Sequence, residues 1–152
     1  FDGLIHFYEG YEWFLDHMLA DALATHLEWP DVLAYPYVVE ADASLLEKLA
    51  SGLTRGITIS TPGFYAPQGR RLRLEPFDNE INDNITSFRF RGERVTNYEM
   101  ESSAIYGLSK LMNHKALTIC VVIGNRITGE FLNDYKPAIS ALVRQVLEGL
   151  SS

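Results

Sequence analysis

The sequence is poor in the residues that build disulfides and metal sites. Cys120 is the only cysteine among 152 residues, so the chain can form neither an internal disulfide nor a cysteine metal cluster. No pair of histidines has metal-ligand spacing with a third ligand nearby. The four histidines are His6, His17, His26 and His114. We therefore expect no metal site, and the scarcity of cysteine favours a reducing cytoplasm as the location.

Long apolar runs and positive charge are also scarce. The longest apolar stretch, Ala116 to Ile123, is far too short to span a bilayer, and the start shows no signal-peptide pattern. With 13 basic and 20 acidic residues, the formal net charge is −7, which disfavours nucleic acid as a partner. A glycine-rich phosphate loop of the Walker or dinucleotide type is also absent. These absences exclude several common classes of binding protein.

Apolar residues make up 47% of the chain, and their spacing predicts strands and helices in alternation. Four segments have strand character: 4–8, 55–60, 95–100 and 116–123. The last is a continuous β-branched run, typical of a strand buried on both faces. Five segments have helical character: 11–27, 42–49, 78–88, 101–112 and 137–150. This order predicts an α/β fold with a mostly parallel sheet, and the lack of a repeat or linker predicts a single domain over residues 1–152.

Ligands of such sheets bind beyond the carboxyl ends of the strands, and a first polar segment lies there in the loop at residues 61–71. The phenyl ring of Phe64 could stack on the flat face of a pyrimidine base. The carboxamide of Gln68 could donate and accept along the edge of the base, and the guanidinium of Arg70 could stabilise charge on a carbonyl oxygen. On spacing alone, a solvated turn with ordinary polar residues is the commoner explanation.

A second polar segment, Asn97 to Ser102, reads Asn-Tyr-Glu-Met-Glu-Ser. A carboxylate can accept hydrogen bonds from both ribose hydroxyls, and a thioether can pack on the sugar. Glu99 and Glu101 would share one face only in an extended backbone. The alternative is a helix start whose acidic residues are favoured by the helix dipole. Glycosidase acid–base chemistry by the two glutamates is a weaker alternative, because nothing separates their environments.

A third segment, Gly124-Asn125-Arg126, directly follows the β-branched run. Arg126 would point into the crevice beyond that strand, or else it is a surface arginine in a turn.

Together the three segments resemble the purine/uridine nucleoside phosphorylase family, and specifically the C-terminal portion of its uridine phosphorylases. Phe64-Tyr65 followed by Gln68 and Arg70 is similar to that family's uracil loop, Phe-Tyr-Pro-Gly-Gln-x-Arg. Residues 97–102 resemble its ribose-binding segment, and residues 122–126 resemble its strand ending in Asn-Arg. Residues 2–7 resemble its mid-chain strand. The resemblance implies part of a mixed sheet flanked by helices.

The resemblance also implies roles for individual residues. Phe64 would stack on the base, and Gln68 and Arg70 would bind the uracil edge. Arg126 would help to fix the base carbonyls, so these two arginines and Gln68 would stabilise the anionic uracil that leaves. The ribose would be held by one group of neighbouring residues: Tyr98, Glu99, Met100 and Glu101. Asn125-Arg126 stands where purine-specific relatives carry an acid, which favours a pyrimidine.

The implied reaction is phosphorolysis of uridine to uracil and ribose 1-phosphate, in nucleoside catabolism and pyrimidine salvage. The resemblance implies inorganic phosphate as co-substrate, no organic cofactor, and a homo-oligomer, either a dimer or a hexamer. It implies a small-molecule nucleoside as partner, without nucleic acid or membrane.

Three departures from the family pattern are visible. The family's phosphate-binding residues lie upstream of position 1, and Phe1-Asp2-Gly3 looks like the end of an earlier element, so we expect a fragment that is inactive alone. Residues 11–27 look like a helical insertion, and Ala66-Pro67 replaces Pro-Gly in the uracil loop. The alternatives are a nucleosidase of the same fold, or a non-catalytic ligand-binding or oligomerisation fragment.

Overall fold

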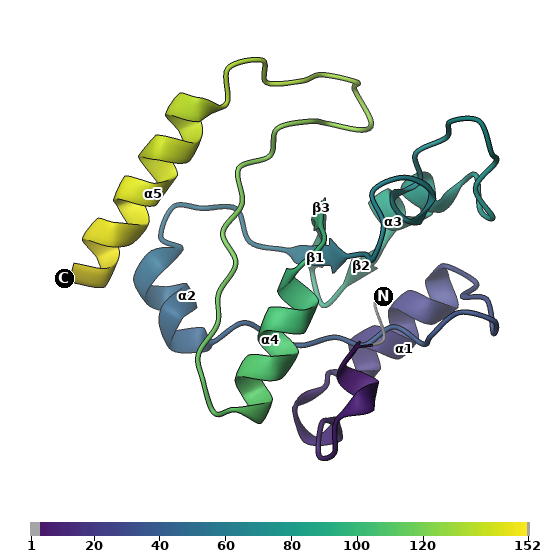
Figure 1. The fold of residues 1–152 in the computed structure, drawn as a ribbon, viewed down its shortest axis with the longest axis horizontal. Helices are drawn as coiled ribbons and strands as arrows, with labels where there is room; N and C mark the ends of the chain where they lie inside the picture. Colours follow the sequence, from purple (N-terminus) through teal and green to yellow (C-terminus); the bar gives the residue numbers. More distant parts are fainter. Residues whose placement is uncertain (1–3, 152) are drawn as a thin grey trace. The chain divides into compact units, whose positions relative to one another are not determined.

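The computed structural model describes residues 4–151, and the expectations for residues 1–3 lie outside this range. The described chain divides into two compact units, each built from two separate segments (Figure 1). We call the described residues up to 40 together with 55–116 the sheet unit, and residues 41–54 together with those from 117 onward the helix-pair unit. None of the described helices is long and apolar enough to cross a bilayer.

The sheet unit contains a three-stranded mixed sheet in the order β1-β3-β2. β1 (Ile57–Ser60) runs parallel to β3 (Glu93–Glu99), and β2 (Arg89–Phe90) pairs with β3 in the antiparallel direction. The helices of this unit are α1 (His17–His26), α3 (Ile81–Ser87) and α4 (Ser102–Leu111). The expected α/β class with a mixed sheet and flanking helices is therefore confirmed.

The core of the sheet unit lies between α1, α3 and the strands. Its buried members are Leu23, Leu27, Ile59, Ile85 and Phe88. Burying each such side chain contributes roughly 1.5–3 kcal/mol, so this cluster is the main source of stability for the unit. Because the apolar face of α3 enters this core, α3 is fixed relative to β1 and β3.

The helix-pair unit is built on α2 (Ala43–Leu49) and α5 (Lys136–Ser151). The Asp42 carboxylate accepts a hydrogen bond from the Leu45 amide at 3.0 Å and caps α2. A Cβ added to Gly149 would lie 2.8 Å from Leu49 Cδ2, so the two helices meet closely at this glycine. In the same place, Lys48 Nζ donates to the Leu150 carbonyl at 3.4 Å.

Most predicted elements are present with boundaries shifted by a few residues. The predicted helices at 42–49, 78–88, 101–112 and 137–150 correspond to α2, α3, α4 and α5, and the predicted strands at 55–60 and 95–100 correspond to β1 and β3. The helix expected over 11–27 is broken into a 3-10 turn (η2, Glu12–Phe14) and α1. The break falls at Leu15, which bridges to Val39, and at Asp16, which caps α1 by accepting from the Leu19 amide.

The strand predicted over residues 4–8 is wrong. Leu4–Phe7 forms a 3-10 turn (η1), with a local bond from the Tyr8 amide to the Ile5 carbonyl at 3.1 Å. Ile5 is nevertheless buried, and it packs where Gly107 of α4 lacks a side chain. Phe7 and Tyr8 are exposed, so the run predicted neither the strand nor the burial of most of its residues, because a short apolar run does not fix the backbone conformation.

The buried strand predicted over residues 116–123 is also wrong. This segment belongs to no strand, and its residues are half-buried or exposed. A strand needs a neighbour to satisfy its backbone hydrogen bonds, and the described residues of the helix-pair unit offer no other strand. An isolated antiparallel bridge of this unit joins Gly124 and Phe131.

Candidate functional site

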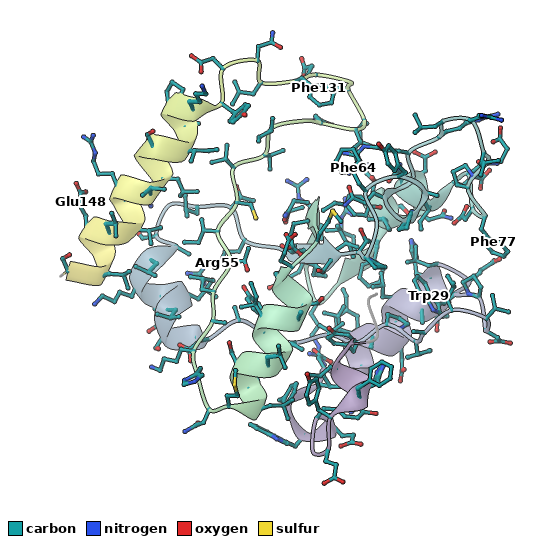
Figure 2. The ribbon with its side chains drawn as sticks, viewed as in Figure 1. Trp29, Arg55, Phe64, Phe77, Phe131 and Glu148 are labelled. Atoms are coloured by element: carbon teal, nitrogen blue, oxygen red, sulfur yellow. The ribbon has the colours of Figure 1, made fainter. Side chains whose placement is uncertain are left out.

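The loop beyond β1 holds Phe64, Gln68 and Arg70 in mutual contact. The Arg70 guanidinium lies 3.6 Å from the centroid of the Phe64 ring and donates to the Phe64 carbonyl at 2.5 Å. It also donates to Gln68 Oε1 at 2.6 Å. Partial burial lowers the pKa of Arg70 from its ordinary value, and Tyr65 opposes that shift. The three residues predicted to read a base thus form one cluster, of which Figure 2 labels Phe64.

The cluster differs in accessibility from one member to the next. Phe64 is half exposed, whereas the Gln68 side chain is 3% exposed and already bonded through Oε1. A short 3-10 turn, η3 (Ala66–Gln68), carries Gln68 inward. Ala66-Pro67 therefore closes the loop as a helical turn, with Gly69 in a left-handed conformation behind it. The Phe64 ring is therefore accessible from solvent, whereas Gln68 is covered.

The start of this loop is hydrogen-bonded to the second predicted segment. The carboxyl ends of β1 and β3 lie side by side because the two strands are parallel, with Ser60 opposite Glu99. One step further, the amide of buried Thr61 donates to the Glu99 carbonyl at 3.1 Å. The parallel pairing of β1 and β3 therefore brings the base-reading loop and the predicted sugar segment together.

At the junction between β3 and α4, Glu99 folds back onto the start of the helix. Glu99 Oε2 accepts from the amides of Glu101 at 2.8 Å and Ser102 at 2.7 Å, and Oε1 accepts from the Ser102 hydroxyl at 2.5 Å. Burial raises the pKa of Glu99, but hydrogen bonds from Ser102, the Glu101 amide and Ser60 together lower it below its ordinary value. Glu99 therefore ends β3 and bonds to the first amides of α4 from outside the helix, whereas the helix-start alternative places the acidic residues within the first turn.

The neighbouring acid is in a different environment. The backbone turns at Glu101, which precedes the first residue of α4, so the two carboxylates do not share the face of one extended strand. Within residues 4–151, no hydrogen bond or ion pair engages the exposed Glu101 carboxylate. Met100 is 37% exposed beside it. Of the two glutamates, Glu101 is the one whose oxygens are available to a ligand.

Tyr98 points away from this junction. Its ring packs against the core, and its hydroxyl donates to Asn82 Oδ1 at 3.0 Å. Sequence patterns gave no sign of Asn82, which also donates from Nδ2 to the Gly69 carbonyl at 3.3 Å. Asn82 is identified only by its contacts with distant segments, which the spacing of motifs does not reveal.

Arg126 lies in the helix-pair unit, at the tip of a tight turn. Asn125 Oδ1 accepts from the amides of Ile127 and Thr128 at 2.9 and 3.2 Å, and Asn125 N donates to the Glu130 carbonyl at 2.9 Å. The turn alternative is therefore correct for the local backbone, and the role of Arg126 stays a prediction. Asn125 and Glu130 help to line a hollow of about 460 Å³ beside this turn, but Arg126 lines neither that hollow nor one of about 330 Å³ along α5.

Among residues 4–151, no three histidine, cysteine or acidic side chains are grouped so that they could hold a metal ion. Hydrogen-bond donors, one carboxylate and an aromatic face are what the sheet unit presents at the ends of β1 and β3.

Comparison with known proteins gives a family and one informative relative. A sequence model described as the phosphorylase superfamily matches residues 10–148. Over 105 residues the chain is 34% identical to a protein of Thermococcus kodakarensis (strain ATCC BAA-918 / JCM 12380 / KOD1) described as uridine phosphorylase. That alignment covers 64% of this chain and 36% of the relative, so the matched region spans about a third of the relative's length. No solved structure matches the chain significantly.

Proposed function

Since the chain belongs to the phosphorylase superfamily, we propose that it forms the base- and ribose-binding part of a uridine phosphorylase. The observation that supports this most directly is the contact between the base-reading loop and the sugar segment, made by the Thr61 amide and the Glu99 carbonyl. The name of the Thermococcus relative supports the choice of uridine. The reaction is phosphorolysis of uridine to uracil and ribose 1-phosphate, which serves nucleoside catabolism and pyrimidine salvage.

The proposed chemistry uses hydrogen-bond donors at the base. A phosphate oxygen attacks C1′ of the ribose, the bond from C1′ to N1 of the base breaks, and its electron pair leaves with uracil. Arg70 and Gln68 stabilise the negative charge that spreads to the uracil carbonyls. A role for Arg126 at the base stays a prediction that rests on the family resemblance. Catalysis then consists of positioning and of charge stabilisation at the leaving base.

The sugar is held at the junction between β3 and α4. In this proposal the free carboxylate of Glu101 accepts from the ribose hydroxyls, and Met100 packs on the sugar. Glu99 holds the junction through its bonds to the start of α4. Phosphate is bound by residues outside this chain, because no segment here matches that part of the family pattern. We also expect a cytoplasmic homo-oligomer.

A comparison of binding and turnover tests the proposal. Uridine affinity of the chain is measured by calorimetry, and uracil release is followed by chromatography with and without inorganic phosphate. Binding without turnover is expected from the isolated chain. Phosphate-dependent release would show that the chain contains its own phosphate site, and release without phosphate would indicate a nucleosidase. A chain that binds no uridine at millimolar concentration would refute the proposal.

Gln68→Ala gives a residue-specific test of the base-reading loop. Loss of the carboxamide should weaken uridine binding by about tenfold, the effect of one or two lost hydrogen bonds to a charged or polar partner. Gln145→Ala, an exposed glutamine of α5, serves as the matched control. Circular dichroism checks that the fold is kept. Unchanged affinity in a folded Gln68→Ala variant would remove Gln68 from the site.

A further inference from the structure

Asn82 connects two parts of the candidate site that are separate in the sequence. It lies in the first turn of α3, 13 positions after Gly69 and 16 before Tyr98. Its Nδ2 donates to the Gly69 carbonyl at 3.3 Å, and its Oδ1 accepts from the Tyr98 hydroxyl at 3.0 Å. One side chain thus uses both ends of its carboxamide to join the base-reading loop to β3.

The two hydrogen-bond partners of Asn82 lie next to residues predicted to bind the ligand. Gly69 is the residue between Gln68 and Arg70, and Tyr98 directly precedes Glu99 at the carboxyl end of β3. A shift of Gly69 would therefore move Gln68 and Arg70 together, relative to the end of β3. A shift at the end of β3 would move the predicted sugar ligands.

The packing around this connection is tight. Gly69 has a φ of +67°, and a Cβ added there would lie 2.3 Å from Asn82 Nδ2, so the loop approaches the asparagine more closely than any other residue type allows. On the other side, Ile85 of the same helix is buried in the core, against which the Tyr98 ring also packs. The connection is therefore anchored to the rigid part of the sheet unit.

We propose that Asn82 is a positioning residue that sets the spacing between the base-reading loop and the sugar-binding junction, an inference that rests on the proposed function. A nucleoside occupies both places at once, whereas free uracil occupies only the loop. When two linked groups bind at two places, affinity depends on how well the spacing of the places matches the ligand. Asn82 consequently determines the preference for a nucleoside over its free base.

Three variants separate this role from a general effect on stability. Asn82→Ala removes both hydrogen bonds, and Asn82→Asp keeps the acceptor for Tyr98 but cannot donate to Gly69. Asn84→Ala is the matched control, because within the described residues Asn84 lies on the same helix and its side chain makes no hydrogen bond. Thermal unfolding of each variant confirms that it is folded before ligands are added.

Uridine and uracil are then titrated separately by calorimetry. Asn82→Ala should weaken uridine binding by about tenfold and uracil binding by less than about twofold, with Asn82→Asp between Asn82→Ala and the parent. Asn84→Ala should change neither affinity. Equal weakening of both ligands, or no weakening of either by Asn82→Ala, would overturn the proposal.

A measurement without ligand tests the connection itself. The amides of Gly69 and Arg70 donate to Ala66 O at 2.8 Å and Tyr65 O at 2.9 Å, so their hydrogen exchange reports the order of the loop. Exchange at both should accelerate in Asn82→Ala and stay unchanged in Asn84→Ala, while amides within α4 serve as internal reference. Unchanged exchange in Asn82→Ala would overturn the positioning role.

The two levels of the proposal can fail separately. If the parent chain binds neither uridine nor uracil, the proposed function is refuted together with the claim of nucleoside preference, and hydrogen exchange alone decides whether Asn82 fixes the loop. If the parent binds uridine but the ratio of the two affinities is insensitive to Asn82, only the positioning role is refuted.

Discussion

Replacement of Glu99 by glutamine should destabilise the sheet unit in a pH-dependent manner. The carboxylate accepts three hydrogen bonds at the start of α4, and a glutamine side chain in its place could keep only those that its single carbonyl oxygen reaches. Losing a side-chain cap at a helix start costs about 0.5–2 kcal/mol, so we expect a loss of about 1–2 kcal/mol for Glu99→Gln at pH 7.

The direction of the pH dependence follows from the lowered pKa of Glu99. Its ordinary pKa is 4.5, and the folded value lies below that. An acid whose pKa is lowered by folding stabilises the folded state above its unfolded pKa, and this contribution is lost as pH falls through the folded pKa. The difference in unfolding free energy between parent and Glu99→Gln should therefore have its largest value at pH 7 and decrease progressively below pH 4.5.

Tryptophan fluorescence during urea unfolding is a suitable assay. The two tryptophans, Trp13 and Trp29, both belong to the sheet unit, so the signal reports that unit separately from the helix pair. Glu101→Gln is the matched control, since its carboxylate makes no hydrogen bond within residues 4–151 and exposed substitutions usually change stability by less than about 0.5 kcal/mol. A destabilisation by Glu99→Gln that is the same at pH 7 and pH 3 would refute the reasoning.

Two further substitutions test the packing of the sheet unit. Phe88→Ala should cost about 3–5 kcal/mol by the same fluorescence assay, because Phe88 is 2% exposed within the core, and a loss below about 1 kcal/mol would contradict that burial. Gly56→Ala should cost about 1–3 kcal/mol, because the new Cβ would lie 2.7 Å from the Arg94 carbonyl oxygen and 2.4 Å from Thr96 Cγ2. A Gly56→Ala variant as stable as the parent would show that β1 and β3 are spaced more widely than described.

Local signals predicted most of the secondary structure. The helix predicted over 42–49 is α2, and its cap Asp42 bonds to an amide only three positions away. The apolar spacing of α4 and α5 likewise depends on neighbours one turn away, and both helices lie where they were expected. The three polar segments could also be found from the sequence, because each is a short run of residues and their order along the chain resembles the family pattern.

The features that could not be predicted from the sequence are contacts between residues that are distant along the chain. Residues 116–123 have the composition of a buried strand, yet pairing requires a neighbouring strand that composition cannot supply. The inward turn of Gln68 and the two hydrogen bonds of Asn82 depend on Arg70, Gly69 and Tyr98 meeting in space. The role of Glu99 as a cap from outside α4 was not predicted, because its spacing to Glu101 fits both a strand end and a helix start.

The interleaving of the two units has a consequence for how the chain can fold and be cut. Lys48 and Leu150 are hydrogen-bonded across 102 positions. The apolar side of α2 is therefore covered only after α5, which is distant in the sequence, has packed against it. Contacts of such long range slow folding, because the closing of a large loop precedes any gain in stability. A single protease cut between residues 116 and 117 would place α5 on one fragment and α2 on the other, although the two helices pack together.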